Sequence, residues 1–72
     1  MKGDEVAVSM TADEWNERHP SGTAVRYYPV RGDMYSEDTE TRSEAWELGH
    51  GAPVVKVVGR TGGVLLEHLQ VI

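Results

Sequence analysis

The chain has 72 residues, no cysteine, and a net charge of −5 from 7 basic and 12 acidic side chains. This length allows a single domain with a small core, and the lack of cysteine excludes disulfides and thiolate metal sites as its support. The negative charge weighs against non-specific binding to nucleic acids. No apolar segment has the roughly 20 residues of a membrane span, and none near the start has the form of a signal peptide. We therefore expect a protein of the cytoplasm with no membrane contact.

The first predicted element is a short helix. Residues 1–10 show only the alternation of Val6 and Val8, which fits a short edge strand or a flexible segment. The capping-box pattern Thr11-Ala12-Asp13-Glu14 then predicts a helix start, because the threonine hydroxyl and the glutamate can satisfy free backbone N–H groups. Pro20 ends helical geometry, so we expect a helix over 12–18. Trp15 is its predicted anchor in the core.

A strand and a loop are predicted next. The alternation in TAVRYYPV, residues 23–30, places Val25 and Tyr27 on one face and Arg26 and Tyr28 on the other. Pro29 has no backbone donor, which predicts that this strand ends at a sheet edge or a bulge. The polar run RGDMYSEDTE, residues 31–40, is predicted to be a long mobile loop.

The second half of the sequence predicts short strands joined by glycine turns. TRSEAWEL, residues 41–48, has period-two character and is interpreted as a strand, although it also fits a short helix. After Gly49-His50-Gly51, two valine- and leucine-rich runs flank the turn 59–63, which predicts a hairpin. Residues 66–69 are expected to form one 3₁₀ turn before a last strand over 70–72. Four or five such strands bury their apolar face most economically by closing, since closure removes exposed edges.

The close of the chain, GRTGGVLLEHLQVI, resembles the end of an SH3-type barrel, with a glycine turn, a strand, one 3₁₀ turn and a short last strand. The resemblance implies that loop 31–40 takes the place of the long first loop of that fold. We therefore expect a mainly β protein: a small SH3-like barrel of four to five antiparallel strands over 23–72, with one short N-terminal helix. The resemblance carries over no peptide-binding residue.

A second resemblance covers most of the chain. HPSGTAVRYYPVRGD and TRSEAWELGHGAPVVKVVGRTGGVLLEHL are similar to short uncharacterised proteins encoded by phages and prophages of proteobacteria. This resemblance implies a phage or prophage origin and a bacterial host cytoplasm. It implies no activity.

No residue pattern predicts catalysis, a cofactor or a metal. The spacing of His19, His50 and His68 matches no metal-ligand motif. The glycine-rich run 59–63 lacks the Lys-Ser/Thr ending of a phosphate loop and leads into a predicted strand, so a hairpin turn is the favoured interpretation. We therefore predict a non-enzymatic protein with no catalytic, cofactor-binding or metal-binding residues.

Two binding functions remain. Cationic and aromatic side chains on the predicted strands suit a protein interface, where Trp, Tyr and Arg dominate the binding energy, and equally suit base stacking and phosphate contacts. The first hypothesis is a protein-interaction module with one partner, such as a bacterial host factor; the second is a nucleic-acid-binding barrel. The candidate interaction surface consists of Arg26, Tyr28, Tyr35, Arg42, Trp46, Lys56 and Arg60.

Three points stay open at this stage. Trp46 could lie in the core, because a chain without phenylalanine needs its large side chains inside. The acidic run 37–40 could mimic nucleic-acid phosphates, although a solvated loop is the favoured interpretation. Either a monomer or a dimer is compatible with the thin core, and the strand edge near Pro29 is one place where two copies could pair.

Overall fold

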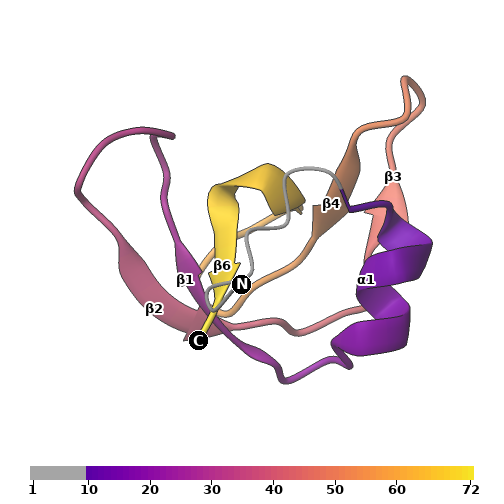
Figure 1. Cartoon of the computed structure of the whole chain (residues 1–72), viewed down its shortest axis with the longest axis horizontal. Coiled ribbons are helices and arrows are strands. Elements are labelled where there is room, and N and C mark those ends of the chain that lie inside the picture. The colour runs from indigo at the N-terminus through magenta and orange to yellow at the C-terminus, as the bar shows by residue number, and fades with distance from the viewer. Residues whose placement is uncertain (1–9) are drawn as a thin grey trace, which may run out of the picture.

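The computed structural model describes residues 10–72, which form one helix and two antiparallel sheets (Figure 1). The predicted edge strand or flexible segment over 1–10 lies, apart from Met10, outside these residues. In chain order the elements are α1 (Ala12–Arg18), β1 (Ala24–Tyr27), β2 (Glu37–Glu40), β3 (Trp46–Glu47), β4 (Pro53–Val55), β5 (Val64–Leu65), the 3₁₀ turn η2 (Leu66–His68) and β6 (Leu69–Val71).

Helix α1 has the predicted bounds and the predicted cap. The Thr11 hydroxyl accepts the Glu14 N–H at 3.1 Å, and the Thr11 N–H donates to Glu14 Oε1 at 2.9 Å. Trp15 is fully buried, as expected, and its ring lies 4.6 Å from that of His19. The Asn16 side chain docks the helix beside β3, because its amide donates to the Ala45 carbonyl at 3.0 Å while its oxygen accepts the Ala45 N–H at 2.7 Å.

The first sheet has the order β2–β1–β6. The alternation predicted for its central strand is confirmed: Val25 is fully buried, and Arg26 on the other face pairs with Asp38 and Gln70. Two predictions were wrong. The strand ending before Pro29 is the central one, so it offers no free edge for a second copy. The predicted loop 31–40 ends early, because Glu37–Glu40 pairs along β1 as strand β2.

The second sheet has the order β3–β4–β5. Of the strand predicted over 41–48, only Trp46–Glu47 forms regular pairs, with Val54 and Pro53. The physical reason is that regular backbone pairing with β4 is interrupted between Thr41 and Ala45, where a side chain takes the place of a backbone acceptor: the Ser43 hydroxyl accepts the Lys56 N–H at 3.1 Å. The predicted hairpin is present as β4 and β5, followed by the predicted 3₁₀ turn and a last strand that starts one residue early, at Leu69.

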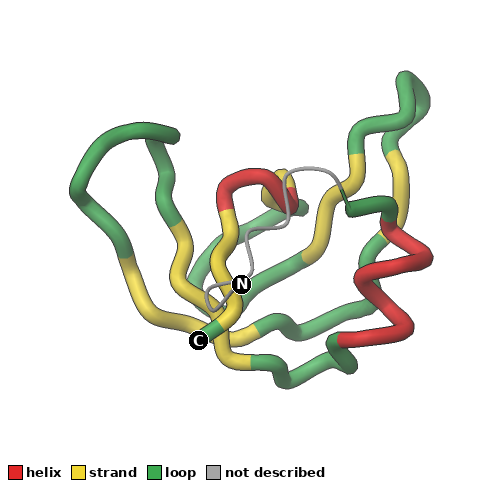
Figure 2. The backbone as a smooth tube through the Cα atoms, viewed as in Figure 1, coloured by secondary structure: helices red, strands yellow, loops and turns green. Residues whose placement is uncertain are grey.

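The two sheets meet at Thr41 but do not close into the predicted barrel (Figure 2). Thr41 forms an isolated bridge with Val57, and its hydroxyl accepts the N–H groups of Gly22 and Thr23 at 3.1 and 3.2 Å. Strands of two to four residues offer too few ladder bonds for continuous closure. The core lies between the sheets and α1 and consists of Ala12, Trp15, Val25, Ala45, Val55, Val57, Val64, Leu66 and Leu69.

Candidate functional site

The seven residues predicted as one interaction surface are spread over both sheets and the segments that join them. Arg26 and Tyr28 share the outer face of the first sheet, whereas Trp46 and Lys56 belong to the second sheet or its flank. Tyr35 lies in the loop between β1 and β2, Arg60 in the turn between β4 and β5, and Arg42 at the junction of the sheets. The fold therefore does not bring the seven residues together as a single surface.

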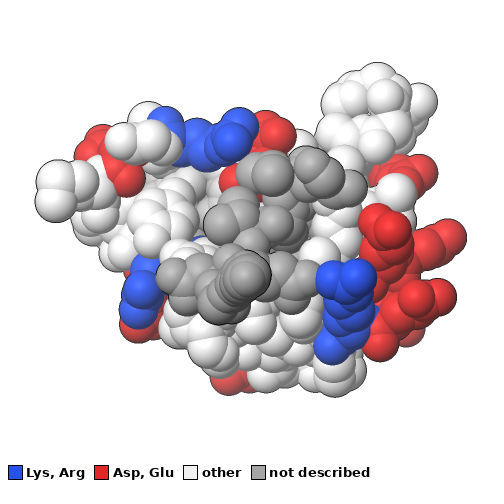
Figure 3. Space-filling view, in the orientation of Figure 1, with Lys and Arg blue, Asp and Glu red and all other residues white. Residues whose placement is uncertain are grey.

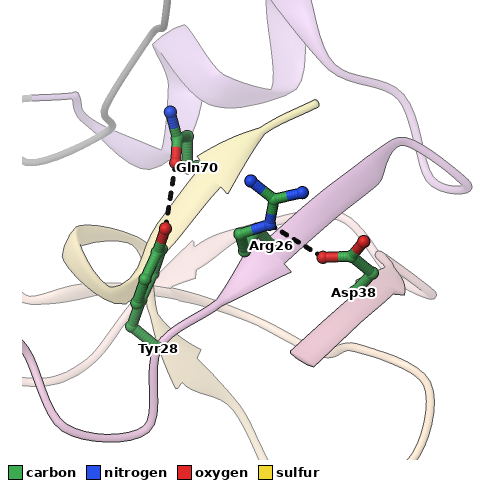
Figure 4. A network of polar contacts seen from close by, with 4 residues as sticks. All are labelled: Arg26, Tyr28, Asp38 and Gln70. Carbon is green, nitrogen blue, oxygen red and sulfur yellow. Dashed lines mark hydrogen bonds and ion pairs between the residues drawn. The ribbon is translucent and has the colours of Figure 1, made fainter. Parts of the chain in front are cut away.

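The outer face of the first sheet is a polar network (Figure 4). Arg26 Nε donates to Asp38 Oδ1 at 2.9 Å, and the Tyr28 hydroxyl donates to Gln70 Oε1 at 3.3 Å. The hydrogen bond from Arg26 lowers the pKa of Asp38 below its ordinary value. The Asp38 carboxylate offsets part of the positive charge of Arg26, which weakens the attraction of this side chain for a phosphate.

Arg60 and Tyr35 meet at a second polar cluster around Glu37. Arg60 Nη2 lies 3.0 Å from Glu37 Oε2, and its guanidinium sits 5.0 Å from the centre of the Tyr27 ring. The Tyr35 hydroxyl donates to Glu37 Oε2 at 2.6 Å. The hydrogen bonds from Tyr35 and Arg60 lower the pKa of Glu37, and the bond to Glu37 raises the pKa of Tyr35. The acidic run 37–40 is thus a strand with two of its carboxylates paired, which overturns its interpretation as a solvated loop.

Arg42 has a structural role. Its Nε donates to the Val57 carbonyl at 3.0 Å and its Nη2 donates to the Arg60 carbonyl at 2.9 Å. The side chain therefore fixes the start of the β4–β5 turn. Lys56 contributes backbone groups to the same junction, since its carbonyl accepts the Arg42 N–H at 2.8 Å.

Trp46 lies on the surface, with 39% of its residue area exposed. The register pairs Trp46 with Val54 and Val54 with Leu65, so the three side chains form one row on the outer face of the second sheet. Val54 is only 3% exposed and stands outside the main core, because this row covers it. Leu48 and Ala52 continue the face, joined by a hydrogen bond of 2.9 Å from the Leu48 N–H to the Ala52 carbonyl. We call Trp46, Leu48, Ala52, Val54 and Leu65 the apolar face.

Gly63 leaves room for the far end of the Trp46 indole. A Cβ atom at residue 63 would stand 3.0 Å from Trp46 Cη2 and 3.0 Å from Val54 Cγ2. Such distances are closer than ordinary van der Waals contact, so any larger side chain would displace the indole or press on Val54. Gly63 therefore shapes the apolar face, although the sequence showed it only as part of a turn.

A cavity of about 290 Å³ opens at the end of the apolar face. It is lined by His50, Ala52, Pro53, Leu65 and Glu67. Sequence reasoning assigned no binding role to these residues. The sequence does contain a signal that could have found this face, because apolar residues alternate on both sides of Gly49-His50-Gly51. A tight hairpin at these glycines sets Leu48 opposite Ala52 and Trp46 opposite Val54.

A second cavity, of about 300 Å³, lies on the other side of the 3₁₀ turn and is lined in part by Tyr28, Arg31, His68 and Gln70. Glu67 lines this cavity as well as the first. The Arg31 guanidinium reaches the Glu67 carboxylate only at 3.9 Å, with both side chains about half exposed. The His68 ring is held by the backbone of Tyr28, since its Nδ1 lies 2.7 Å from the Tyr28 carbonyl oxygen.

The segment between β3 and β4 projects from the body of the molecule and contains no Lys, Arg, Asp or Glu (Figure 3). Acidic side chains gather beside it, over α1 and β3. In the part of the chain that the structure describes, no three histidine, aspartate or glutamate side chains form a group that could hold a metal ion. The surface around the segment between β3 and β4 is therefore suited to bury apolar groups of a partner next to carboxylates.

Residues 10–72 contain no helix long and apolar enough to cross a membrane. A comparison with protein-family models, with curated proteins and with solved structures gives no match at any of the three levels.

Proposed function

We propose that the protein is a non-enzymatic binding module that holds a protein partner on the apolar face. The observation that carries this proposal is the exposure of Trp46 and Leu48, each 39% exposed, in one continuous face with Ala52, Val54 and Leu65. Exposed apolar side chains gathered on one face are typical of interaction sites, and tryptophan is enriched among residues that dominate binding energy. The far end of the Trp46 indole also reaches Gly63, and a side chain that already packs on the sheet loses less conformational freedom on binding.

Binding to nucleic acid through Arg26, Arg42, Lys56 and Arg60 is the alternative. Three of these four cations already hold partners within the chain: Arg26 holds Asp38, Arg60 holds Glu37, and Arg42 holds two carbonyl groups. The carboxylates offset the charge of Arg26 and Arg60, and the chain has a net charge of −5, so a phosphate would be attracted only weakly. The protein-binding function is therefore the better supported of the two.

The strand order supports an SH3-like arrangement in an open form. A long loop joins β1 to β2, a projecting hairpin joins β3 to β4, and one 3₁₀ turn leads into β6 beside β1 (Figure 1). A phage or prophage origin and a partner from the bacterial host stay predictions that rest on the sequence resemblance. Cytoplasmic placement likewise stays a prediction.

An affinity capture from nuclease-treated bacterial lysate tests the function. Wild-type protein, the apolar-face variants Trp46→Ser and Leu48→Ser, and the control Val58→Ser are compared by mass spectrometry. Val58 is a matched control because it is an apolar residue, 51% exposed, that lies away from the apolar face. We expect one protein to be retained at a fixed ratio by wild type and by Val58→Ser and lost from both apolar-face variants.

Three results would contradict the proposal. Capture that vanishes with nuclease would favour the nucleic-acid alternative. Capture that is equal for wild type and both apolar-face variants would move the interface elsewhere. A wild-type dimer in light scattering that becomes monomeric on Leu48→Ser would show that a second copy of the chain covers this face. Circular dichroism of each variant checks that the fold is retained, and Leu48→Ser, in the projecting hairpin, is the variant less prone to disturb the sheet.

A further inference from the structure

The cavity at the end of the apolar face has apolar walls and one charged group. Ala52, Pro53 and Leu65 supply aliphatic surface, and Glu67 is the only carboxylate among its lining residues. His50, from the segment between β3 and β4, also lines the cavity. A side chain that fits this combination has an aliphatic stem and a positive end, which is the construction of lysine and arginine.

We infer that this cavity is the subsite for a lysine or arginine side chain of the partner. This inference rests on the proposed function and names the chemistry of the partner. The methylene stem lies against Leu65 and Pro53, and the ammonium or guanidinium group pairs with the Glu67 carboxylate. Neighbouring apolar residues of the same partner segment then lie on Trp46, because Leu65 belongs both to the cavity and to the Trp46 row.

The Glu67 carboxylate is available for such a pair. Its one ion pair within residues 10–72 is the contact with Arg31 at 3.9 Å, at the long end of the range, and both side chains are about half exposed. A partner cation at ordinary hydrogen-bond distance would be held more strongly than Arg31 is. Arg31 lines the other cavity and does not fill the one beside Leu65.

The charge of the surroundings favours a cation over an anion. Acidic side chains gather near the projecting hairpin (Figure 3), and the whole chain carries −5. An anionic or neutral group in the cavity would leave the Glu67 carboxylate without a new partner in a partly desolvated place. A basic partner segment therefore gains from both the local and the overall charge.

The test is a titration of isotope-labelled protein followed by amide NMR shifts. The probes are N-acetyl-arginine amide, N-acetyl-lysine amide and the uncharged N-acetyl-norleucine amide, which keeps the aliphatic stem without the charge. The proteins are wild type, Glu67→Gln and the control Glu47→Gln. Glu47 is a matched control because it is an exposed carboxylate on β3, paired with Pro53 in the register but outside the cavity lining.

We expect saturable shifts at the amides of Ala52, Leu65 and Glu67 with at least one cationic probe. Removal of one charge-assisted contact should weaken the binding of that probe about fivefold or more in Glu67→Gln, and far less in Glu47→Gln, which removes a neighbouring charge but no contact. Added salt should also weaken it. Shifts of equal size with the norleucine probe, or a cationic probe that binds Glu67→Gln as well as wild type, would overturn the inference.

The failure of this inference and of the proposed function can be told apart. If the captured partner is lost from Leu48→Ser but retained by Glu67→Gln, the apolar face binds a partner and the cation subsite is wrong. If Leu48→Ser retains the partner as wild type does, the proposed function itself is wrong, whatever the NMR titration gives.

Discussion

The outer faces of the two sheets are built on the same kind of framework and carry opposite chemistry. Each is one side of a three-stranded antiparallel sheet with a row of three paired residues at its centre. In the first sheet that row is Asp38–Arg26–Gln70; in the second it is Trp46–Val54–Leu65. Cross-strand neighbours determine what such a face does, because their side chains stand within contact distance.

The comparison shows which face is complete by itself. The polar face satisfies its own groups, with Arg26 on Asp38 and Tyr28 on Gln70. The apolar face buries Val54 but leaves Trp46 and Leu48 partly exposed. An exposed apolar group gains free energy when a partner removes it from water, whereas a satisfied polar group gains little. The second face is therefore the one suited to binding.

The largest stability effect is expected at the junction that holds the two faces apart. Thr41→Val keeps the shape of the side chain but removes the oxygen that accepts the N–H groups of Gly22 and Thr23. The two N–H groups keep backbone acceptors, the Thr41 carbonyl at 2.8 Å from Gly22 N and the Pro20 carbonyl at 3.1 Å from Thr23 N. Loss of the two bonds to the buried hydroxyl should therefore lower the free energy of unfolding by about 1–2 kcal/mol, measured by urea denaturation. Thr39→Val is the control: Thr39 donates one exposed hydrogen bond, to the Val58 carbonyl, and its substitution should cost less. An equal loss in both variants would contradict the junction role.

The next effect concerns how the apolar face is packed. Gly63→Val places methyl groups against Trp46 and Val54, where a Cβ atom alone would already come within 3.0 Å. We expect a loss of about 1 kcal/mol in the free energy of unfolding, because the partly exposed indole can move aside. The displaced indole should raise acrylamide quenching of Trp46. Gly49→Val is the control, since a Cβ atom there meets nothing within 4 Å. If both variants keep wild-type stability and quenching, the indole does not lie over Gly63.

A smaller effect is expected on the polar face. Arg26→Gln or Asp38→Asn removes an exposed ion pair, and such pairs contribute little to stability. We expect a decrease in Tm smaller than that of Gly63→Val, and smaller still when salt is added. The double variant should show whether the two effects are coupled. A decrease as large as that of Gly63→Val would mean that the polar face supports the fold as strongly as the apolar one.

The smallest effect is a pH dependence at the polar cluster around Glu37. Because Tyr35 and Arg60 lower the pKa of Glu37 in the folded protein, the ionised carboxylate stabilises the fold above the ordinary glutamate pKa. That contribution is lost as the pH falls through the lowered folded-state value. Tm followed from neutral to acid pH should therefore fall less steeply in Glu37→Gln than in wild type. Identical slopes would show that Glu37 does not contribute. Glu40→Gln is the control, since Glu40 is an exposed carboxylate of the same strand that forms no ion pair within residues 10–72.

The sequence predicted the elements whose signals are local. The cap at Thr11, the end of the helix before Pro20, the alternation through Val25 and Arg26, and the glycine turn 59–63 each depend on residues close together in the chain. Strand lengths and sheet edges were predicted less well. The pairing of Glu37–Glu40 with β1 cannot be found from hydrophobicity, because acidic residues have a low strand propensity and only the neighbouring strand with Arg26 makes this segment a strand.

The sequence by itself determined a small, mainly β chain with one capped helix, a buried Trp15 and an acidic charge, since periodicity, capping and turn chemistry act over a few residues. Only the tertiary structure decided that Trp46 lies on a face with Val54 and Leu65, that Arg26, Arg42 and Arg60 are held within the chain, and that Glu67 borders an apolar cavity. These facts depend on register and on contacts between distant segments. A shift of one residue in the register would turn every side chain of a strand to the opposite face.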